Sequence, residues 1–402
     1  MRHAFARFCP PVFLLLISLF GMQAVSAADD QIATNSQSVA YAYVGSSAPA
    51  QQDYSQGFIT GFAIAPDGSA QAIPAFRVFG GISGLTSASG FIFGIGRLGT
   101  TVQTYTPQSD GSLRATSSVD VIDDYDSHND EYVSALNPDR TGGMLNVGAV
   151  WPNSDFLPFA IQSDGSLALE GTITSGCGKS QAQLTFSPDN RWSYDQCSYS
   201  VSMYQRQGNG VLDGPLDFHL DPPPGVLGSG ACVPAFLGSS ALGYMAVVWN
   251  GNAFACNTHY GNLLAAYTVG PDGNLTLVPG SVLVPRIWEA NIAFDPSGRY
   301  LALAGYIGYP NPQAAAIQVF KVGADGKFQA LGSPVIVPEI QKFQQVEWDK
   351  SGHLYTAPSC AQQTCSTQKL YIFNVGENGV TPAPGSPHAV PYLQSLAVLP
   401  AK

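Results

Sequence analysis

A Gly-containing hairpin recurs along this chain at intervals of roughly 50 residues, a period typical of repeat folds. Each copy is an apolar strand, a polar turn ending in Gly and a second short strand, as in AYTVGPDGNLTLVPGS and VFKVGADGKFQALGSP. Asp-Gly and Asn-Gly favour such turns because both residues tolerate positive φ. The turn glycines are Gly68, Gly111, Gly165, Gly210, Gly273, Gly326 and Gly379. Seven such hairpins predict seven copies of one structural unit.

A second hairpin alternates with the first, at residues 133–150, 184–195, 292–305 and 346–357, with degenerate copies at 79–96 and 233–250. One copy is missing, and its halves stand at the chain ends. SLAVLP (residues 395–400) resembles a first strand, and SVAYAYVG (38–45) resembles a second strand. We therefore predict an all-β, seven-bladed β-propeller with four-stranded antiparallel blades. Its ring is closed by the C-terminal strand A pairing with the N-terminal strand B.

The N-terminus has the three parts of a secretory signal. The basic stretch MRHAFAR precedes the apolar run VFLLLISLF, and small residues then lead to the polar ADDQ. We expect cleavage after Ala27, a flexible segment over residues 28–37 and a single propeller domain over residues 38–400. A retained N-terminal anchor is the alternative. The signal predicts a protein of the periplasm or the extracellular space, and we expect a monomer.

The charge balance bears on the choice of partner. Removing Arg2 and Arg7 with the signal takes the formal charge from −11 to −13. Such an acidic surface disfavours nucleic acids and anionic lipids. After signal cleavage no segment reaches the roughly 20 apolar residues that a membrane span requires. We therefore expect no nucleic-acid partner and no membrane span.

Several stretches of the repeat resemble one known family. These are SVAYAYVGSS followed by GFITGFAIAPDG, the hairpins that end in PGSP, and VPRIWEANIAFDPSGRYLALAG. Together they are similar to the lactonase-type seven-bladed propellers, the family of propeller 6-phosphogluconolactonases, over about residues 38–399. The resemblance implies hydrolysis of a six-membered sugar lactone that carries a phosphate. Once Arg2 and Arg7 are removed, the chain has 15 Lys and Arg for 28 acids, which is little provision for a phosphate.

The propeller layout divides the loops between two rims. The A–B and C–D turns share one rim, and the B–C and D–A loops, beside which propeller ligands usually bind, share the other. The six cysteines of the mature chain allow 15 pairings. Their places in the layout predict the disulfides Cys177–Cys197, Cys232–Cys256 and Cys360–Cys365, which pin loops of the second rim.

Candidate site residues lie where the chain enters strand A on that second rim. Lactone opening needs a base to activate water and a group to stabilise the developing oxyanion. We expect His128 or Glu131 as the base and Arg286 as the oxyanion or carboxylate clamp. The predicted substrate-binding residues are Asn129, Lys179, Glu289, Asn291 and His388. The acidic run over residues 123–131 lacks the spacing of a known calcium loop, so we interpret it as solvated charge and expect neither metal nor cofactor.

Two functions remain open at the level of sequence. The first is an exported lactonase-like hydrolase, acting on a small-molecule lactone or a sugar-derived ester in the central funnel. The second is a non-catalytic propeller of the cell envelope or the extracellular space that binds a glycan, peptide or protein on its disulfide-pinned rim. Phosphogluconolactonase activity itself is the third and least favoured interpretation, because of the export signal and the acidic charge balance.

Overall fold

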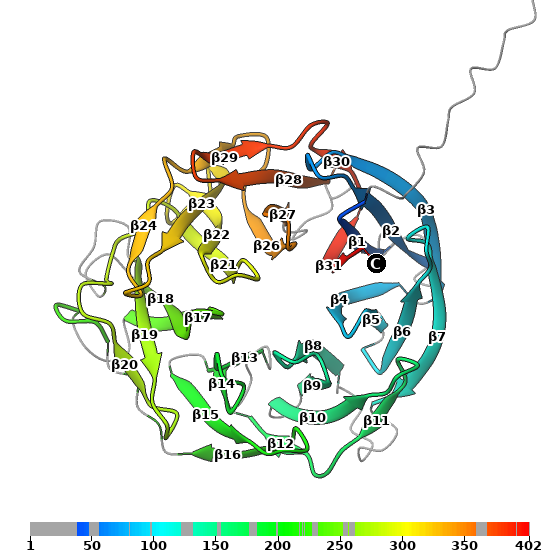
Figure 1. The fold of residues 1–402 in the computed structure, drawn as a ribbon, viewed down its shortest axis with the longest axis horizontal. Coiled ribbons are helices and arrows are strands. Elements are labelled where there is room, and N and C mark those ends of the chain that lie inside the picture. Colours follow the sequence, from blue (N-terminus) through cyan, green and yellow to red (C-terminus); the bar gives the residue numbers. More distant parts are fainter. Residues whose placement is uncertain are drawn as a thin grey trace, which may run out of the picture. The chain divides into compact units, whose positions relative to one another are not determined.

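The computed structural model describes residues 38–47, 56–79, 81–96, 99–121, 132–150, 154–176, 183–197, 200–216, 218, 220, 222–226, 232–251, 256, 262–358, 368–390 and 392–401. All of them belong to one compact unit, Asn35–Lys402. Seven antiparallel sheets surround a common centre in this unit (Figure 1). The predicted all-β, seven-bladed propeller is confirmed.

Each blade is numbered here in chain order, and its strands run from A at the centre to D at the outside. Blade 1 contains β31 (Leu393–Pro400), β1 (Ala40–Ser47), β2 (Gln56–Ile64) and β3 (Ala70–Phe79). Blade 2 contains β4 (Ile82–Ala88), β5 (Phe91–Gly96), β6 (Thr101–Pro107) and β7 (Leu113–Asp120). Blade 3 contains β8 (Tyr132–Pro138), β9 (Met144–Val150), β10 (Ser154–Ile161), β11 (Leu167–Leu169) and β12 (Thr174–Ser175), of which β11 and β12 both pair with β10.

Blade 4 contains β13 (Leu184–Phe186), β14 (Trp192–Gln196), β15 (Val201–Arg206) and β16 (Leu212–Leu216). Blade 5 contains β17 (Cys232–Ser239), β18 (Tyr244–Gly251), β19 (Asn262–Val269) and β20 (Leu275–Leu277). Blade 6 contains β21 (Trp288–Phe294), β22 (Tyr300–Ile307), β23 (Ala314–Val322), β24 (Phe328–Ala330) and β25 (Val335–Val337). Blade 7 contains β26 (Phe343–Trp348), β27 (His353–Pro358), β28 (Lys369–Gly376), β29 (Gly379–Pro382) and β30 (His388–Ala389).

The ring closes through the two ends of the chain, as predicted. Strand β31 pairs antiparallel with β1, with Tyr41 opposite Leu399 and Val44 opposite Leu396. Hydrogen bonds between two segments so distant in sequence hold the first and last blades together and remove a free sheet edge. Ring closure therefore depends on both termini of the propeller.

The core lies between neighbouring blades and not within any one of them. Strand β22 is buried along nearly its whole length, whereas the outer strand β7 alternates between partly buried and exposed residues. One core cluster joins Trp192 and Met203 of blade 4 to Met245 and Tyr267 of blade 5. Middle strands covered on both faces become continuous apolar runs, which explains the sequence YLALAGYI of β22.

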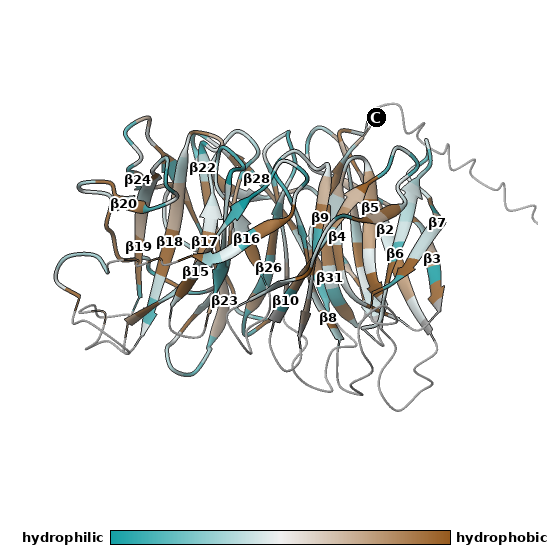
Figure 2. Ribbon diagram, turned by 90° about the horizontal axis from the view of Figure 1, so that it is seen from below, coloured by the Kyte–Doolittle hydropathy of each residue, from teal (hydrophilic) through white to brown (hydrophobic). Residues whose placement is uncertain are grey.

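The short turns lie along one edge of the ring, the upper edge in Figure 2. This edge, called the hairpin rim here, carries the A–B and C–D turns. The opposite edge, called the loop rim, carries the B–C and D–A connections. The recurring glycine of the C–D turn belongs to the hairpin rim and serves to join blades.

Each C–D turn docks on the beginning of strand B in the preceding blade. Gly273 has φ +85°, and a Cβ there would approach Trp192 and Met203 to 2.6 and 2.5 Å. The Oη of Tyr194 donates to the carbonyl oxygen of Gly273 at 2.6 Å. Equivalent pairs are Gly68 with His353, Gly111 with Tyr41, Gly165 with Phe91, Gly210 with Met144 and Gly326 with Tyr244. In blade 7 the turn residue Glu377 instead accepts a hydrogen bond from the Oη of Tyr300 in blade 6. The repeat therefore builds the interfaces between blades.

Among the described residues, strand A carries a β-bulge near the loop rim in six blades. The register shifts fall between residues 82 and 84, 133 and 135, 234 and 236, 289 and 291, 343 and 345, and at the equivalent place in β31. A bulge redirects the side chains beside it. It therefore sets the direction in which residues at the start of strand A face.

Candidate ligand site on the loop rim

The predicted site residues divide into those inside and those outside the described ranges. His128, Asn129, Glu131 and Lys179 lie outside them, as do the acidic run and three predicted disulfide partners, Cys177, Cys360 and Cys365. Arg286, Glu289 and Asn291 lie together where the chain enters β21 of blade 6. His388 lies in β30 of blade 7.

The backbone around Arg286 is held from two blades. The backbone N–H of Arg286 donates to Oε1 of the buried Gln318, a residue of β23, at 2.7 Å. The next carbonyl oxygen, that of Ile287, accepts from the Nδ2 of Asn262 in blade 5 at 2.6 Å. The Arg286 side chain is exposed, and among the described residues it forms no ion pair. An exposed guanidinium with no ion pair to the described residues therefore extends from a fixed backbone, which suits recognition of an anionic group.

Two aromatic rings stack beside this loop. The rings of Trp288 and Tyr309 are nearly parallel, at 14°, with centroids 4.0 Å apart. Trp288 is the first residue of β21 and lies opposite Tyr306 of β22, and Tyr309 follows two residues after that strand ends. Tyr309 is 46% exposed. The stacked pair therefore offers a flat apolar surface to solvent on the loop rim.

A second cation borders the aromatic residues. The Nζ of Lys342 lies 5.7 Å from the centroid of the Tyr306 ring, which is within cation–π range. Burial lowers the pKa of Lys342, and burial raises the pKa of Tyr306 to about 12. Lys342 directly precedes β26, so it occupies in blade 7 the place that Trp288 occupies in blade 6. Lys342 thus borders the aromatic cluster, and Arg286 lies two residues before Trp288 in the chain.

Glu289 lies under this cluster and is 2% exposed. Its two carboxylate oxygens accept from the Nδ2 of Asn262 at 2.8 and 2.9 Å. Burial raises the pKa of Glu289 to about 8, and the hydrogen bonds from Asn262 oppose that rise. The position before the bulge is apolar in five other blades, where it holds Ile82, Val133, Pro234, Phe343 and Leu393. Of these six blades, blade 6 is the one with a carboxyl group at the position before the bulge.

Asn291 follows the bulge and bridges to the next blade. Its Nδ2 donates to the carbonyl oxygen of Gln344 at 3.2 Å, and its Oδ1 accepts from the N–H of Ile292 at 2.8 Å. Both contacts are with protein groups. They fix the spacing between the entrances of β21 and β26, from which Arg286 and Lys342 extend.

The disulfide Cys232–Cys256 is present, as predicted. Cys232 begins β17, and Cys256 lies between β18 and β19, so the bond closes the loop-rim end of blade 5. This is the blade that supplies Asn262. Cys197 is also disulfide-bonded, and Cys177, its predicted partner, lies outside the described residues.

His388 is not brought together with Arg286. It lies in β30, which pairs with the third strand of blade 7, while Arg286 precedes the innermost strand of blade 6. Its ring packs against Phe62 of blade 1 with centroids 5.4 Å apart. Burial lowers the pKa of His388. The part of the chain that the structure describes thus places this histidine between the outer strands of two blades.

The sequence interpretation overlooked Trp288, Tyr306, Tyr309 and Lys342 as site residues. The available signal was their register. Trp288 pairs with Tyr306, and the stretch IGYPNPQ after β22 is a short turn-rich loop that can carry an aromatic ring back over its own strand. Predicting the contact between Trp288 and Tyr309 requires knowing which residue of β21 pairs with which residue of β22.

Neither a metal-ligand cluster nor a membrane-spanning helix occurs in the described residues. In these ranges no three His, Cys, Asp or Glu side chains gather in a way that could hold a metal ion. The same ranges contain no helix with the length and hydropathy of a membrane span.

The fold defines a class, the seven-bladed propellers with four-stranded blades. No known family profile matches this sequence, and neither does any curated protein. Solved structures of the same fold include a candidate 6-phosphogluconolactonase from Bacteroides uniformis, 15% identical with a TM-score of 0.61, covering 90% of this chain and 100% of that one. Another from Bacteroides fragilis is 16% identical with a TM-score of 0.60, covering 91% and 99%.

A hypothetical selenium-binding protein from Sulfolobus tokodaii aligns equally well. It is 8% identical, with a TM-score of 0.61 over 91% of this chain and 93% of its own. Proteins described so differently share the architecture, since propeller folds carry many functions. The resemblance to lactonase-type propellers is therefore confirmed at the level of the fold.

Proposed function

We propose that this protein is an exported lactonase-like propeller that binds a sugar-derived lactone or ester at the loop rim of blade 6 and hydrolyses it. The observation that carries the proposal is the exposed Trp288–Tyr309 stack, with Arg286 two residues before Trp288 in the chain and Lys342 over the neighbouring Tyr306 ring. Aromatic faces pack well against the C–H faces of sugar rings. Cations beside such a platform suit the carboxylate that lactone opening produces.

The reaction assigns a role to each group. A base removes a proton from water as the water oxygen attacks the lactone carbonyl, and the carbonyl oxygen becomes an oxyanion. Arg286 stabilises that oxyanion and afterwards the product carboxylate. The ring C–O bond then breaks, and the alkoxide oxygen takes up a proton. His128 or Glu131 remains the predicted base.

The substrate is proposed on chemical grounds. Two of the solved structures above are described as candidate 6-phosphogluconolactonases, and Arg286 and Lys342 could face a phosphate. The sequence nevertheless favours a neutral or weakly charged lactone, because so few basic residues are available in the mature chain. Both classes therefore belong in the assay.

The experiment measures acid release from a panel of lactones by pH-stat, with spontaneous hydrolysis subtracted. The panel contains glucono-δ-lactone, galactono-γ-lactone and 6-phosphogluconolactone. We expect wild-type turnover of at least one lactone and a loss of about 100-fold in kcat/KM for Arg286→Ala. The matched control is Arg114→Ala, which removes an exposed cation from the outer strand β7. Equal rates for wild type, Arg286→Ala and the buffer blank would refute hydrolysis at this site.

A second function is favoured by the same stack, namely glycan binding without turnover. The exposed ring of Tyr309 and the disulfide that pins the neighbouring blade would suit a binding surface as well as an active site. A glycan array followed by tryptophan fluorescence titration separates the two. Saturable binding that Trp288→Ala abolishes, together with no lactone turnover, would support this second function over the first.

A further inference from the structure

A cavity of 410 Å³ opens on the hairpin rim, away from the site just described. Its lining comes from the inner ends of blades 1, 2, 3, 6 and 7, at the A–B turns and the end of β31. These five blades are consecutive around the ring, and their inner ends come together only near its axis. The cavity therefore forms the mouth of the central opening at this rim.

One repeat position supplies much of that lining. In three blades strand A is followed by an aspartate and then by the lining residue, which is Arg140 in blade 3, Pro296 in blade 6 and Lys350 in blade 7. Pro400 takes the corresponding place at the end of β31. Both charged residues in this series are cations. They stand out in a chain with a formal charge of −11.

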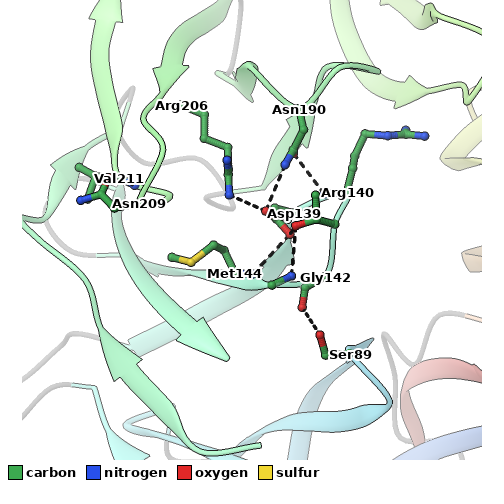
Figure 3. Close-up of polar contacts among 11 residues, drawn as sticks. Ser89, Asp139, Arg140, Gly142, Met144, Asn190, Arg206, Asn209 and Val211 are labelled. Carbon is green, nitrogen blue, oxygen red and sulfur yellow. Dashed lines mark hydrogen bonds and ion pairs between the residues drawn. The ribbon is translucent and has the colours of Figure 1, made fainter. Parts of the chain in front are cut away.

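The aspartate before Arg140 is already satisfied by other groups. Arg206 donates to Asp139 at 2.6 Å, Asn190 donates at 3.1 Å, and the hydroxyl of Thr141 reaches both carboxylate oxygens at 2.9 Å. Figure 3 shows Arg206 and Asn190 directed at Asp139, whereas the guanidinium of Arg140 extends away from it. The charge of Asp139 is balanced by Arg206 and not by Arg140.

The aspartate before Lys350 is likewise engaged inside its own blade. Asp349 accepts from the Oη of Tyr355 at 2.8 Å and lies 2.6 Å from Nδ1 of His353. The backbone N–H groups of Ser351 and His353 donate to its other oxygen. Among the described residues, Asp139 and Asp349 are the cavity's carboxylates, and neither forms an ion pair with Arg140 or Lys350.

Among the described residues, neutral oxygens hold Arg140 in place. Its Nη1 donates to the Oγ and the carbonyl oxygen of Ser239 in blade 5, at 2.8 and 3.1 Å. The asparagine that contacts Asp139 also accepts the backbone N–H of Arg140 at 3.2 Å. Partial loss of solvation lowers the pKa of the guanidinium. A cation positioned by neutral oxygens keeps its charge available to a ligand.

The two cations belong to blades that are not neighbours in the ring. Blade 3 and blade 7 are separated by blades 1 and 2 in one direction around the ring and by blades 4, 5 and 6 in the other. A single small anion at one side of the mouth would meet one cation. We propose that the axial cavity of the hairpin rim binds a small dicarboxylate, with one carboxylate on Arg140 and the other on Lys350.

Isothermal titration of the mature chain with malonate, succinate, glutarate and adipate tests the proposal. Acetate and sulfate are the controls, because each carries its charge on one group and would contact one cation. We expect one site, a preference for one chain length, and affinity at least about tenfold weaker in Arg140→Ala and in Lys350→Ala. Arg140→Gln keeps a donor for Ser239 and should lose affinity equally while retaining the fold. Arg114→Ala and Trp288→Ala should bind as wild type does, which separates this site from the loop rim.

Three outcomes would overturn the proposal. The first is the absence of binding heat for every dicarboxylate. The second is unchanged affinity in folded Arg140→Gln and Lys350→Ala. The third is affinity for acetate or sulfate equal to that for the best dicarboxylate, because a ligand that needs one cation does not bridge two.

Discussion

The side-chain amide of Asn262 in blade 5 donates to both carboxylate oxygens of Glu289 in blade 6, at 2.8 and 2.9 Å. Both residues are buried. The same amide nitrogen also reaches the carbonyl oxygen of Ile287, so one asparagine connects blade 5 to the loop that presents Arg286. The protonation state of a buried acid is thereby linked to the geometry of the candidate ligand site.

This link predicts a pH dependence of stability. Burial raises the pKa of Glu289 from 4.5 to about 8 on folding, so the folded protein retains a proton that the unfolded chain releases. Its contribution is fully present below pH 4.5 and is lost as pH rises through about 8, by on the order of 1.4 kcal/mol per pKa unit. Urea denaturation from pH 5 to 9 should show this decline.

The control for that prediction is Glu289→Gln, which keeps an acceptor for Asn262 and removes the titrating proton. We expect its stability to change less with pH than that of wild type over the same range. Parallel pH profiles for wild type and variant would show that Glu289 does not set the dependence.

The contact between Gly273 and Trp192 predicts that Gly273→Ala is strongly destabilising. The new Cβ would meet a ring held in the interface between blades 4 and 5, at a φ of +85° that alanine adopts poorly. Strain and overpacking together should lower the free energy of unfolding by about 3 kcal/mol. Gly208→Ala is the matched control, because a Cβ there meets nothing within 4 Å and the equivalent turn in blade 6 carries Ala324. Its effect should stay under about 1 kcal/mol in either direction.

The ion pair between Arg206 and Asp139 predicts an asymmetry between buried and exposed pairs. Side-chain exposure is 14% for Arg206 and 0% for Asp139, against 50% and 57% for Lys327 and Asp325. Arg206→Met leaves a buried carboxylate without its cation and should cost about 3 kcal/mol. Lys327→Met should cost less than about 1 kcal/mol. Chemical denaturation of the two variants measures the free energy of unfolding that each one loses. Equal losses would show that burial of the ion pair does not matter.

The disulfide Cys232–Cys256 predicts a constraint on the unfolded chain. The bond joins residues 24 positions apart, and opening a loop of that size should lower the free energy of unfolding by about 3 kcal/mol. Either Cys232→Ala or Cys256→Ala breaks the bond, so the double variant should be hardly less stable than each single one. Thermal and urea unfolding of the three variants measures this. If the two cysteines acted only through packing, the stability losses of the single variants would add up in the double variant.

Much of the fold was predictable because the sequence contains a structural repeat. The turn glycines gave the number of blades, and the split hairpin at residues 38–45 and 395–400 gave the ring closure that the Tyr41–Leu399 pairing confirms. Both inferences rest on local turn chemistry and strand alternation, which do not depend on distant contacts. The pairing of Cys232 with Cys256 followed from the same layout.

The candidate site could be predicted only in part. Arg286, Glu289 and Asn291 were expected at the start of a strand A and lie there. The burial of Glu289 under Asn262, the stacking of Trp288 on Tyr309 and the location of Lys342 arise from contacts between different strands and blades. A sequence pattern specifies which face of a strand is apolar, and it leaves open which side chain of a neighbouring blade will cover that face.

The axial cavity shows the same division. Sequence determined that the A–B turns of blades 3 and 7 begin with Asp139 and Asp349, whose side chains accept backbone hydrogen bonds inside the turn. Tertiary structure decided that Arg206, from another blade, neutralises the first of these acids and leaves Arg140 free to face the axis. Local rules fix turns and strands, because those depend on neighbouring residues. The charge of a site depends on which side chains the closed ring brings together, and only the completed ring determines that.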